Sequence, residues 1–280
     1  MILSATLMSC RVVISSRIAV AAYLLSCAIG FSAAASGSLT VEQIVKKTVE
    51  RAEGIQAANT QLDYSYTKFS VTEEFNGKGK LKEKKEKLLQ FESGRGRLSQ
   101  LKLNGRALSG AEFKRQEQAA LEAHQQITDS KANRHEDNWE KYITPQLVAK
   151  YSFKLLAEEV VNGRSAYVLG FEPLSSNLPV THLIDRLINR LGGKVWIDKQ
   201  DFEVARAQVG LRGEVALWGG VLGNLKKCNF TVERSRVDDN VWFNTATNGE
   251  FEGRKLLEPT HIRTRSESSN FHKTARRANS

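Results

Sequence analysis

The stretch GKVWIDKQDFEVAR, residues 193–206, places two runs of β-forming residues on either side of a polar turn. Lys194–Asp198 and Val204–Leu211 are predicted to be strands, because β-branched and aromatic residues are enriched in strands. The turn between them, residues 198–201, contains two aspartates, a residue type that hydrogen-bonds to the local backbone in turns. We therefore expect a strand–turn–strand unit here.

The same pattern recurs along the rest of the chain. Asn76-Gly77 and Asn162-Gly163 are the residue pairs that tight hairpin turns prefer. About ten strands, mostly antiparallel neighbours, and three helices are predicted, so the expected fold class is α+β with a large meandering sheet. The further strands expected are Leu62–Phe75, Lys80–Phe91, Arg97–Leu103, Tyr151–Val161, Ala166–Pro173, Cys228–Val237, Val241–Phe251 and His261–Ser269.

Three segments have helical patterns. Thr40 and Gln43 form a capping-box pair at the start of a short amphipathic helix that is expected to end near Gly54. A charged helix, residues 110–126, leads into a polar linker, residues 128–138. The third helix, Thr181–Leu191, has one continuous apolar face. That face consists of Leu183, Ile184, Leu187, Ile188 and Leu191.

The composition is that of a globular protein with a basic surface. The 280 residues include 41 Lys+Arg and 31 Asp+Glu, for a net charge of +10, and 41% are hydrophobic, which excludes collagen and wholesale disorder. Arg11 and Arg17 precede an apolar run that ends in small residues at Ala35, which is typical of a secretory signal peptide over residues 1–35. No later stretch has the roughly 20 apolar residues that a bilayer span needs. We therefore expect a soluble, periplasmic protein after export.

The expected domain organisation follows from the predicted signal peptide, residues 1–35, and from the composition of the rest of the chain. Residues 36–272 form a single domain that includes the charged helix, and residues 273–280 form a basic disordered tail. Cys228 is the one cysteine outside the presequence, so no intramolecular disulfide is expected. A second processing route stays open, because Leu24-Leu25-Ser26-Cys27 loosely resembles a lipoprotein box that would leave Cys27 lipidated.

Reactive constellations are not apparent in the sequence. The five histidines have no metal-ligand spacing to one another or to Cys228, so neither a metal nor a cofactor is expected. There is no phosphate-binding loop, dinucleotide-binding fingerprint or nucleophile elbow. The carboxylate pairs Asp198/Asp201 and Asp238/Asp239 lie in turns, where Asp is common for structural reasons. The sequence therefore favours a protein that is not an enzyme.

Apolar surfaces are the remaining candidates. Alternating strand positions supply apolar and aromatic side chains, and the helix Thr181–Leu191 has an apolar face to lay over the open side of the sheet. These residues predict either a ligand cavity with a lid or an ordinary sheet-and-helix core, and composition does not decide between the two. The candidate cavity and lid residues are Tyr64, Tyr66, Tyr167, Leu169, Phe171, Leu183, Ile184, Leu187, Ile188, Leu191, Trp196 and Trp242.

Two further surfaces are candidates for contact with lipid. The loop that contains Leu217, Trp218, Val221 and Leu222 precedes two lysines, which suits an anionic membrane interface or a partner, or else a buried hairpin plug. The lysine run over residues 78–87 suits an anionic patch or, more simply, a solvated strand protected against aggregation. Nucleic acid is disfavoured as a partner by export.

Several segments of the chain carry a family resemblance. Residues 193–206 resemble the V-W-I-D strand–turn–strand of bacterial outer-membrane lipoprotein-sorting-like proteins, in the superfamily of the periplasmic lipoprotein carriers and acceptors LolA and LolB. The resemblance runs from about Val41 to Phe271. The further segments that carry it are residues 103–109, 161–169, 218–223, 230–237 and 241–242.

The resemblance implies a curved antiparallel sheet that forms an incomplete, half-open β-barrel, with helices as a lid and a concave apolar face that holds acyl chains. It also implies no cofactor and no covalent chemistry. Two departures are the charged helix, residues 110–126, which the small carriers lack, and the absence of an arginine that aligns with the carriers' lid-locking arginine.

We therefore expect a periplasmic binding or carrier protein for lipids or acylated lipoprotein ligands, with peripheral membrane contact at most. The alternative is a non-catalytic envelope sensor or interaction module that uses the same fold to bind a protein partner.

Overall fold

The computed structural model describes residues 39–58, 60–92, 95–115, 118, 143–174, 188–217, 223–255 and 258–274. The chain from Thr40 onward forms one compact unit. The expected signal peptide with Cys27, the linker 128–138 and the second half of the charged helix lie outside the described residues. The described elements are α1 (Val41–Ala58), η1 (Thr60–Asp63), β1 (Tyr64–Asn76), β2 (Leu81–Glu92), β3 (Arg95–Leu103), β4 (Arg106–Ala107), α3 (Pro145–Val148), β5 (Tyr151–Val161), β6 (Arg164–Pro173), β7 (Leu191–Asp198), β8 (Val204–Leu211), β9 (Val215–Leu217), β10 (Gly223–Asp238), β11 (Val241–Lys255) and β12 (Glu258–Lys273).

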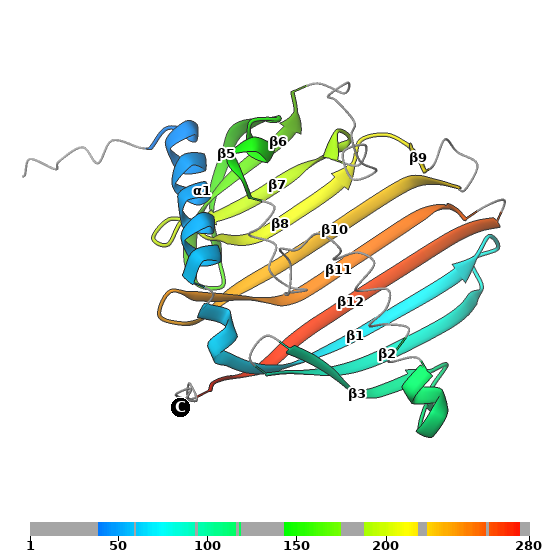
Figure 1. The fold of residues 1–280 in the computed structure, drawn as a ribbon. Helices are drawn as coiled ribbons and strands as arrows, with labels where there is room; N and C mark the ends of the chain where they lie inside the picture. Colours follow the sequence, from blue (N-terminus) through cyan, green and yellow to red (C-terminus); the bar gives the residue numbers. More distant parts are fainter. Residues whose placement is uncertain are drawn as a thin grey trace, which may run out of the picture. The chain divides into compact units, whose positions relative to one another are not determined.

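A single antiparallel sheet contains all twelve described strands (Figure 1). Its order is β4-β3-β2-β1-β12-β11-β10-β8-β7-β6-β5, and the short strand β9 pairs with β10. The two ends of this order, β4 and β5, do not pair with each other, so the described strands form an incomplete barrel. The expected α+β fold with a half-open antiparallel sheet is confirmed. Consecutive strands are neighbours except at β4–β5, which are the two ends of the order, and at β8–β9, and the first long strand pairs with the last.

The helix α1 begins as the sequence predicts and ends later. The Thr40 N–H donates to Gln43 Oε1 at 2.9 Å, and the Gln43 N–H donates to Thr40 Oγ1 at 3.3 Å, which is the expected capping box. The helix continues past Gly54 to Ala58. A helical glycine costs about 1 kcal/mol relative to alanine, but the burial of Ile55 offsets that cost.

The hairpin turns and the C-terminal end also follow from local chemistry. At Asn104-Gly105 and Asn162-Gly163 both residues have positive φ, as the tight hairpin turn requires. At the other end, Lys273 belongs to β12, and the Thr274 N–H donates to the Asp63 carbonyl at 2.7 Å. The expected tail boundary at residue 273 is therefore wrong, because backbone pairing holds the chain as far as Thr274.

Two buried clusters lie within the described sheet. The first joins five strands through Val161, Ala166, Val168, Trp196, Ala205 and Trp242. The second is mainly aromatic and contains Tyr64, Tyr66, Phe91, Val241 and Phe243. Figure 1 shows α1 beside the ends of β7, β8 and the β10–β11 turn, and its side-chain contacts there are described below.

Candidate functional site

One face of the sheet carries two rows of apolar side chains that cross β5, β6, β7, β8 and β10. Residues paired directly across antiparallel strands have side chains on the same face, so the strand register defines each row. The first row is Leu155, Leu169, Val195, Ala207 and Val232, and the second is Phe153, Phe171, Gly193, Val209 and Phe230. We call this side of the sheet the apolar face.

The two rows differ in how far they are covered. In the first row Leu169, Ala207 and Val232 expose 0%, 2% and 6% of their surfaces. In the second row Phe171, Val209 and Phe230 are only half-buried. The second row therefore keeps apolar surface that a ligand can cover, whereas Leu169, Ala207 and Val232 of the first row already form core.

Beyond β10 both rows change from apolar to polar. They continue through small and hydroxyl-bearing residues on β11, β12 and β1 and reach lysines on β2, so one face combines an apolar half with a half that suits polar head groups. The first row continues with Thr247, Ser266, Ser70 and Lys87, and the second with Gly249, Thr264, Thr72 and Lys85.

The aromatic cluster at Tyr64 and Tyr66 is packed. The ring of Tyr66 stacks on Phe91 with centroids 4.5 Å apart and lies 5.3 Å from the ring of Phe243. The Tyr64 hydroxyl donates to Asp238 Oδ2 at 2.5 Å. Burial raises the pKa of Tyr64, and the hydrogen bond to Asp238 adds to this, so that the pKa is about 12. Protein side chains thus surround both tyrosines.

Both predicted tryptophans belong to the core. Trp196 pairs with Val168, whereas its neighbours Val195 and Ile197 pair with Leu169 and Tyr167, so Trp196 lies on the opposite face from those residues. Its Nε1–H donates to Glu159 at 2.8 Å, and it exposes only 5% of its surface. Trp242 exposes 2% of its surface, and its Nε1–H donates to Asp201 at 2.9 Å. Both indoles are therefore buried and hydrogen-bonded within the protein, and a role for them in ligand binding stays a prediction.

The predicted lid is described only at its C-terminal end. Ile188 is helical and half-buried, and the Tyr151 hydroxyl donates to its carbonyl at 2.7 Å. Leu191 is the first residue of β7 and pairs with Leu211, so the helix does not extend to Leu191 as expected. At Leu191 the chain pairs as a strand with Leu211, although the sequence has a helical periodicity at this position. The predicted residues Leu183, Ile184, Leu187, Trp218, Val221 and Leu222 lie outside the described residues, and Leu217 is described only as the last residue of β9.

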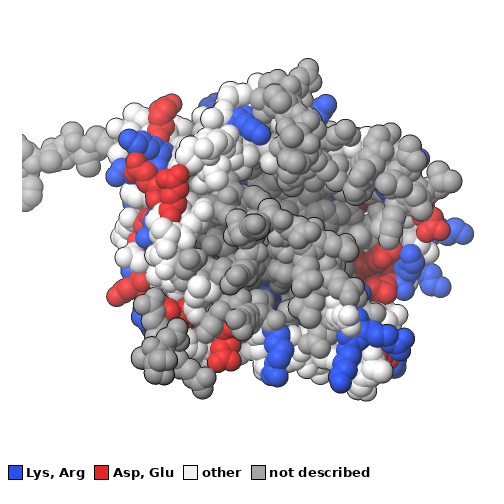
Figure 2. Space-filling model, viewed as in Figure 1, with Lys and Arg blue, Asp and Glu red and all other residues white. Residues whose placement is uncertain are grey.

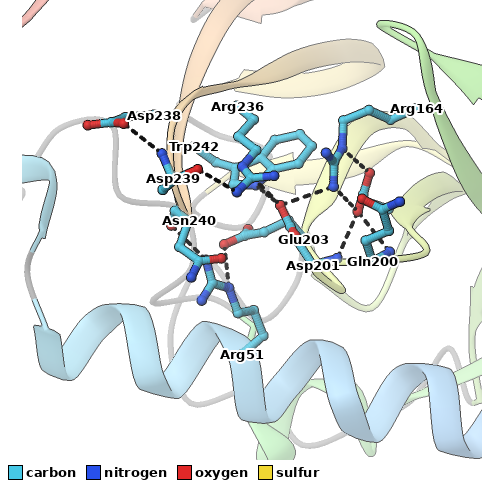
Figure 3. Close-up of polar contacts among 11 residues, drawn as sticks. Arg51, Arg164, Gln200, Asp201, Glu203, Arg236, Asp238, Asp239, Asn240 and Trp242 are labelled. Carbon is cyan, nitrogen blue, oxygen red and sulfur yellow. Dashed lines mark hydrogen bonds and ion pairs between the residues drawn. The ribbon is translucent and has the colours of Figure 1, made fainter.

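Ion pairs join three strand connections at one end of the sheet (Figure 3). Arg164, next to the β5–β6 turn, donates to Asp198 at 2.6 and 2.8 Å and lies 3.2 Å from Asp201, in the β7–β8 turn. Arg236, near the β10–β11 turn, lies 3.6 Å from Asp201. Although burial opposes ionisation, the hydrogen bonds from Arg164 and from the Gln200 and Asp201 backbone hold the pKa of Asp198 below its usual range.

A second set of ion pairs attaches α1 to this end of the sheet. In Figure 3, Arg51 points from the helix toward the sheet, where it donates to Glu203 at 3.1 Å and to the Asn240 carbonyl at 2.7 Å. The other oxygen of Glu203 accepts from Arg234 at 2.7 Å. Arg234 and Glu203 expose only 1% and 3% of their side chains, so this is a buried charge pair with a half-exposed third member.

Over β1, β10, β11 and β12 the opposite side of the sheet carries charged side chains and an open groove of about 550 Å³, and we call this part the charged face. Beside it, Glu250, Glu252 and His261 bring potential metal-ligand atoms within 4.8 Å of one another. The ammonium of Lys227 lies 3.0 and 3.1 Å from the two carboxylates and supplies the cation between them. Hydrogen bonds from Lys227 and His261 lower the pKa of Glu250 to about 2. The cluster therefore works as an ion-pair network.

The lysine run is paired with glutamates on its own and the neighbouring strand. In Figure 2 basic side chains gather mainly at the lower side of the molecule, where Figure 1 draws β2 and β3. Cross-strand and same-strand carboxylates neutralise several of them, as in a solvated strand protected against aggregation. The pairs are Lys82–Glu74 at 2.9 Å, Lys84–Glu86 at 2.7 Å and Lys85–Glu83 at 3.5 Å.

Two other features bear on chemistry and on membranes. Burial raises the pKa of the Cys228 thiol, which keeps it protonated and weakly nucleophilic.

Within the described ranges, every helix is too short or too polar to span a bilayer.

Comparison with known proteins gives similarity to solved structures only. Neither a protein-family model nor a curated protein matches the chain. A putative outer membrane lipoprotein-sorting protein domain from Vibrio parahaemolyticus is 15% identical, covers 84% of this chain and 95% of its own, and has a TM-score of 0.30. A LolA superfamily protein from Nitrosomonas europaea is 14% identical, covers 85% and 94%, and has a TM-score of 0.28. The MucA/MucB complex of Pseudomonas aeruginosa gives 11% identity, coverage of 81% and 99%, and a TM-score of 0.22.

The first two of these structures are of the type that residues 193–206 resemble. Identities and TM-scores this low do not decide what the chain binds.

Proposed function

We propose that this chain is an envelope binding or carrier protein that holds the acyl chain of a lipid, or of a lipidated protein, on the apolar face. The observation that supports this most is the change along the two rows, from half-buried apolar side chains on β6–β10 to hydroxyls and lysines on β11–β2. An amphiphile with an acyl chain and an anionic or polar head group has the same division.

The dimensions and energies are adequate for such a ligand. Five neighbouring strands spaced about 4.8 Å apart span about 19 Å, which is comparable to an extended fatty acyl chain. Each buried methylene contributes about 0.8 kcal/mol, so covering part of one chain is enough for reversible capture. In this proposal Phe171, Val209 and Phe230 contact the acyl chain.

The segment before β7, which the sequence predicts to be helical, completes the proposal as a lid. Its predicted apolar residues are Leu183, Ile184 and Leu187. The hydrogen bond from the Tyr151 hydroxyl to the Ile188 carbonyl attaches its C-terminal end to β5. Movement of the lid about this fixed end would expose the second apolar row. Carrier function, location in the periplasm and the absence of catalysis belong to the same proposal.

The test is binding of a fluorescent fatty acid to the wild-type protein and to two matched variants. Phe230→Asp places a charge in the second apolar row, and we expect it to weaken binding at least tenfold. Phe69→Asp makes the same change at a side chain that exposes 42% of its surface and lies on the charged face, and should leave binding unchanged. Thermal unfolding of both variants checks that they fold.

Equal binding by both variants would overturn the location of the site. Absence of binding in the wild-type protein would favour the alternative, an interaction module that binds a protein partner, as MucB does in its complex with MucA.

A further inference from the structure

Among the described strands, β5 ends the sheet and has no strand on its other side. It has 11 residues, and β6 is its one partner among the described strands. Alternate N–H and C=O groups of such an edge strand point away from the sheet and are ready to pair with another chain. The opposite end of the sheet is the two-residue strand β4.

The side chains of β5 include the charged residues Lys154, Glu158 and Glu159 beside exposed apolar ones. Leu155, Leu156 and Val160 expose 38%, 46% and 70% of their surfaces. Most natural edge strands avoid such apolar exposure through charge, proline or short length. Three exposed apolar side chains on one long edge therefore indicate that the edge meets a partner.

A β-bulge makes β5 complementary to a second copy of itself. The register shifts between Leu155 and Ala157, which leaves Leu156 as an extra residue. Lys154 pairs with Gly170, and Glu159 pairs with Ala166. Gly170 and Ala166 lie on the same face of β6, so the shift brings Lys154 and Glu159 to one face although an odd number of residues separates them. Without the bulge they would lie on opposite faces.

We propose that β5 is a self-association edge, through which two copies of this chain pair antiparallel about a twofold axis perpendicular to the sheet. In this register Lys154 of one copy faces Glu159 of the other, twice by symmetry, and Phe153 faces Val160. Phe153 and Val160 also share a face, since they pair with Phe171 and Ser165. An isologous contact of this kind closes at two copies and joins the two sheets into one.

The test is sedimentation equilibrium of the protein purified from cells that express the full chain, over a wide range of concentration. We expect a reversible dimer. Lys154→Glu and Glu159→Lys should each weaken it about tenfold or more, because each places like charges opposite each other twice. An equimolar mixture of the two variants restores both opposite-charge contacts and should form a heterodimer close to wild-type affinity.

Two further variants keep the test decisive. Glu159 accepts a hydrogen bond from Trp196, so Val160→Asp, at a position 70% exposed, gives a disruption that does not touch the core. Phe69→Asp is the matched control on β1 and should leave the dimer intact. A wild-type protein that is monomeric at every concentration, or a dimer insensitive to all three β5 variants, would overturn the proposal.

Discussion

The replacement of Glu203 by glutamine tests the buried ion pairs that hold α1 against the sheet. Glu203→Gln keeps the shape of the side chain but leaves Arg234, which is 1% exposed, without its carboxylate. Removing one member of a buried ion pair leaves an uncompensated charge and costs about 3–5 kcal/mol. For a domain of this size each kcal/mol lowers the melting temperature by about 2–4 °C, so the expected loss is about 6–20 °C.

The assays are thermal and urea unfolding at neutral pH, with three reference variants. Arg51→Gln removes the more exposed partner, at 25% exposure, and should cost about 1 kcal/mol or less. Lys46→Gln breaks a pair whose members are 77% and 60% exposed and should have almost no effect. The double variant Glu203→Leu/Arg234→Met replaces the pair with apolar groups and should recover most of the loss.

The reasoning would be refuted by a Glu203→Gln protein that melts within a degree or two of the wild type. It would be refuted equally by a double variant less stable than Glu203→Gln, since that would show that the cost lies in packing and not in the unpaired charge.

Three further predictions concern charge. The pKa of Tyr64 is raised from 10.0 to about 12 in the folded protein, so its contribution to stability is complete below pH 10 and is lost as the pH rises toward 12; Tyr64→Phe should abolish that loss in urea unfolding across this range. The pKa of Glu250 is lowered from 4.5 to about 2, so its contribution is present above pH 4.5 and disappears as the pH falls toward 2; Glu250→Gln should show a shallower acid destabilisation, and an equally steep one would contradict the assignment. Lys85→Gln should weaken binding of an anionic fatty acid by about fivefold or less, with a neutral fatty alcohol unaffected, and equal losses for both probes would argue against a head-group role.

Much of the strand framework was predictable because it depends on local signals. The capping box at Thr40 and the Asn162-Gly163 turn act within a few residues, so the sequence contains all of their determinants. The same is true of the alternation that places Leu169 and Val195 on one face. The end of α1 was missed because burial of Ile55, a tertiary effect, offsets the glycine before it.

The site was predictable only in part. The alternation along its strand assigns Trp196 to one face of the sheet, but the pattern alone does not say which of two covered faces binds a ligand. In the structure the indole of Trp196 is buried and donates a hydrogen bond to Glu159. The pairing of Arg234 with Glu203 joins residues far apart in the chain. The available signal was a charged residue within or next to a β-rich run, and such a residue does not identify its partner.

The central claim is that the apolar face binds an acyl chain, and the most direct measurement is native mass spectrometry of the protein purified from cells without detergent, followed by solvent extraction. The account predicts an amphiphile bound at close to one per chain in the wild-type protein and in Phe69→Asp, and lost in Phe230→Asp. A ligand-free mass for the wild-type protein, unchanged after incubation with phospholipid vesicles, would contradict it.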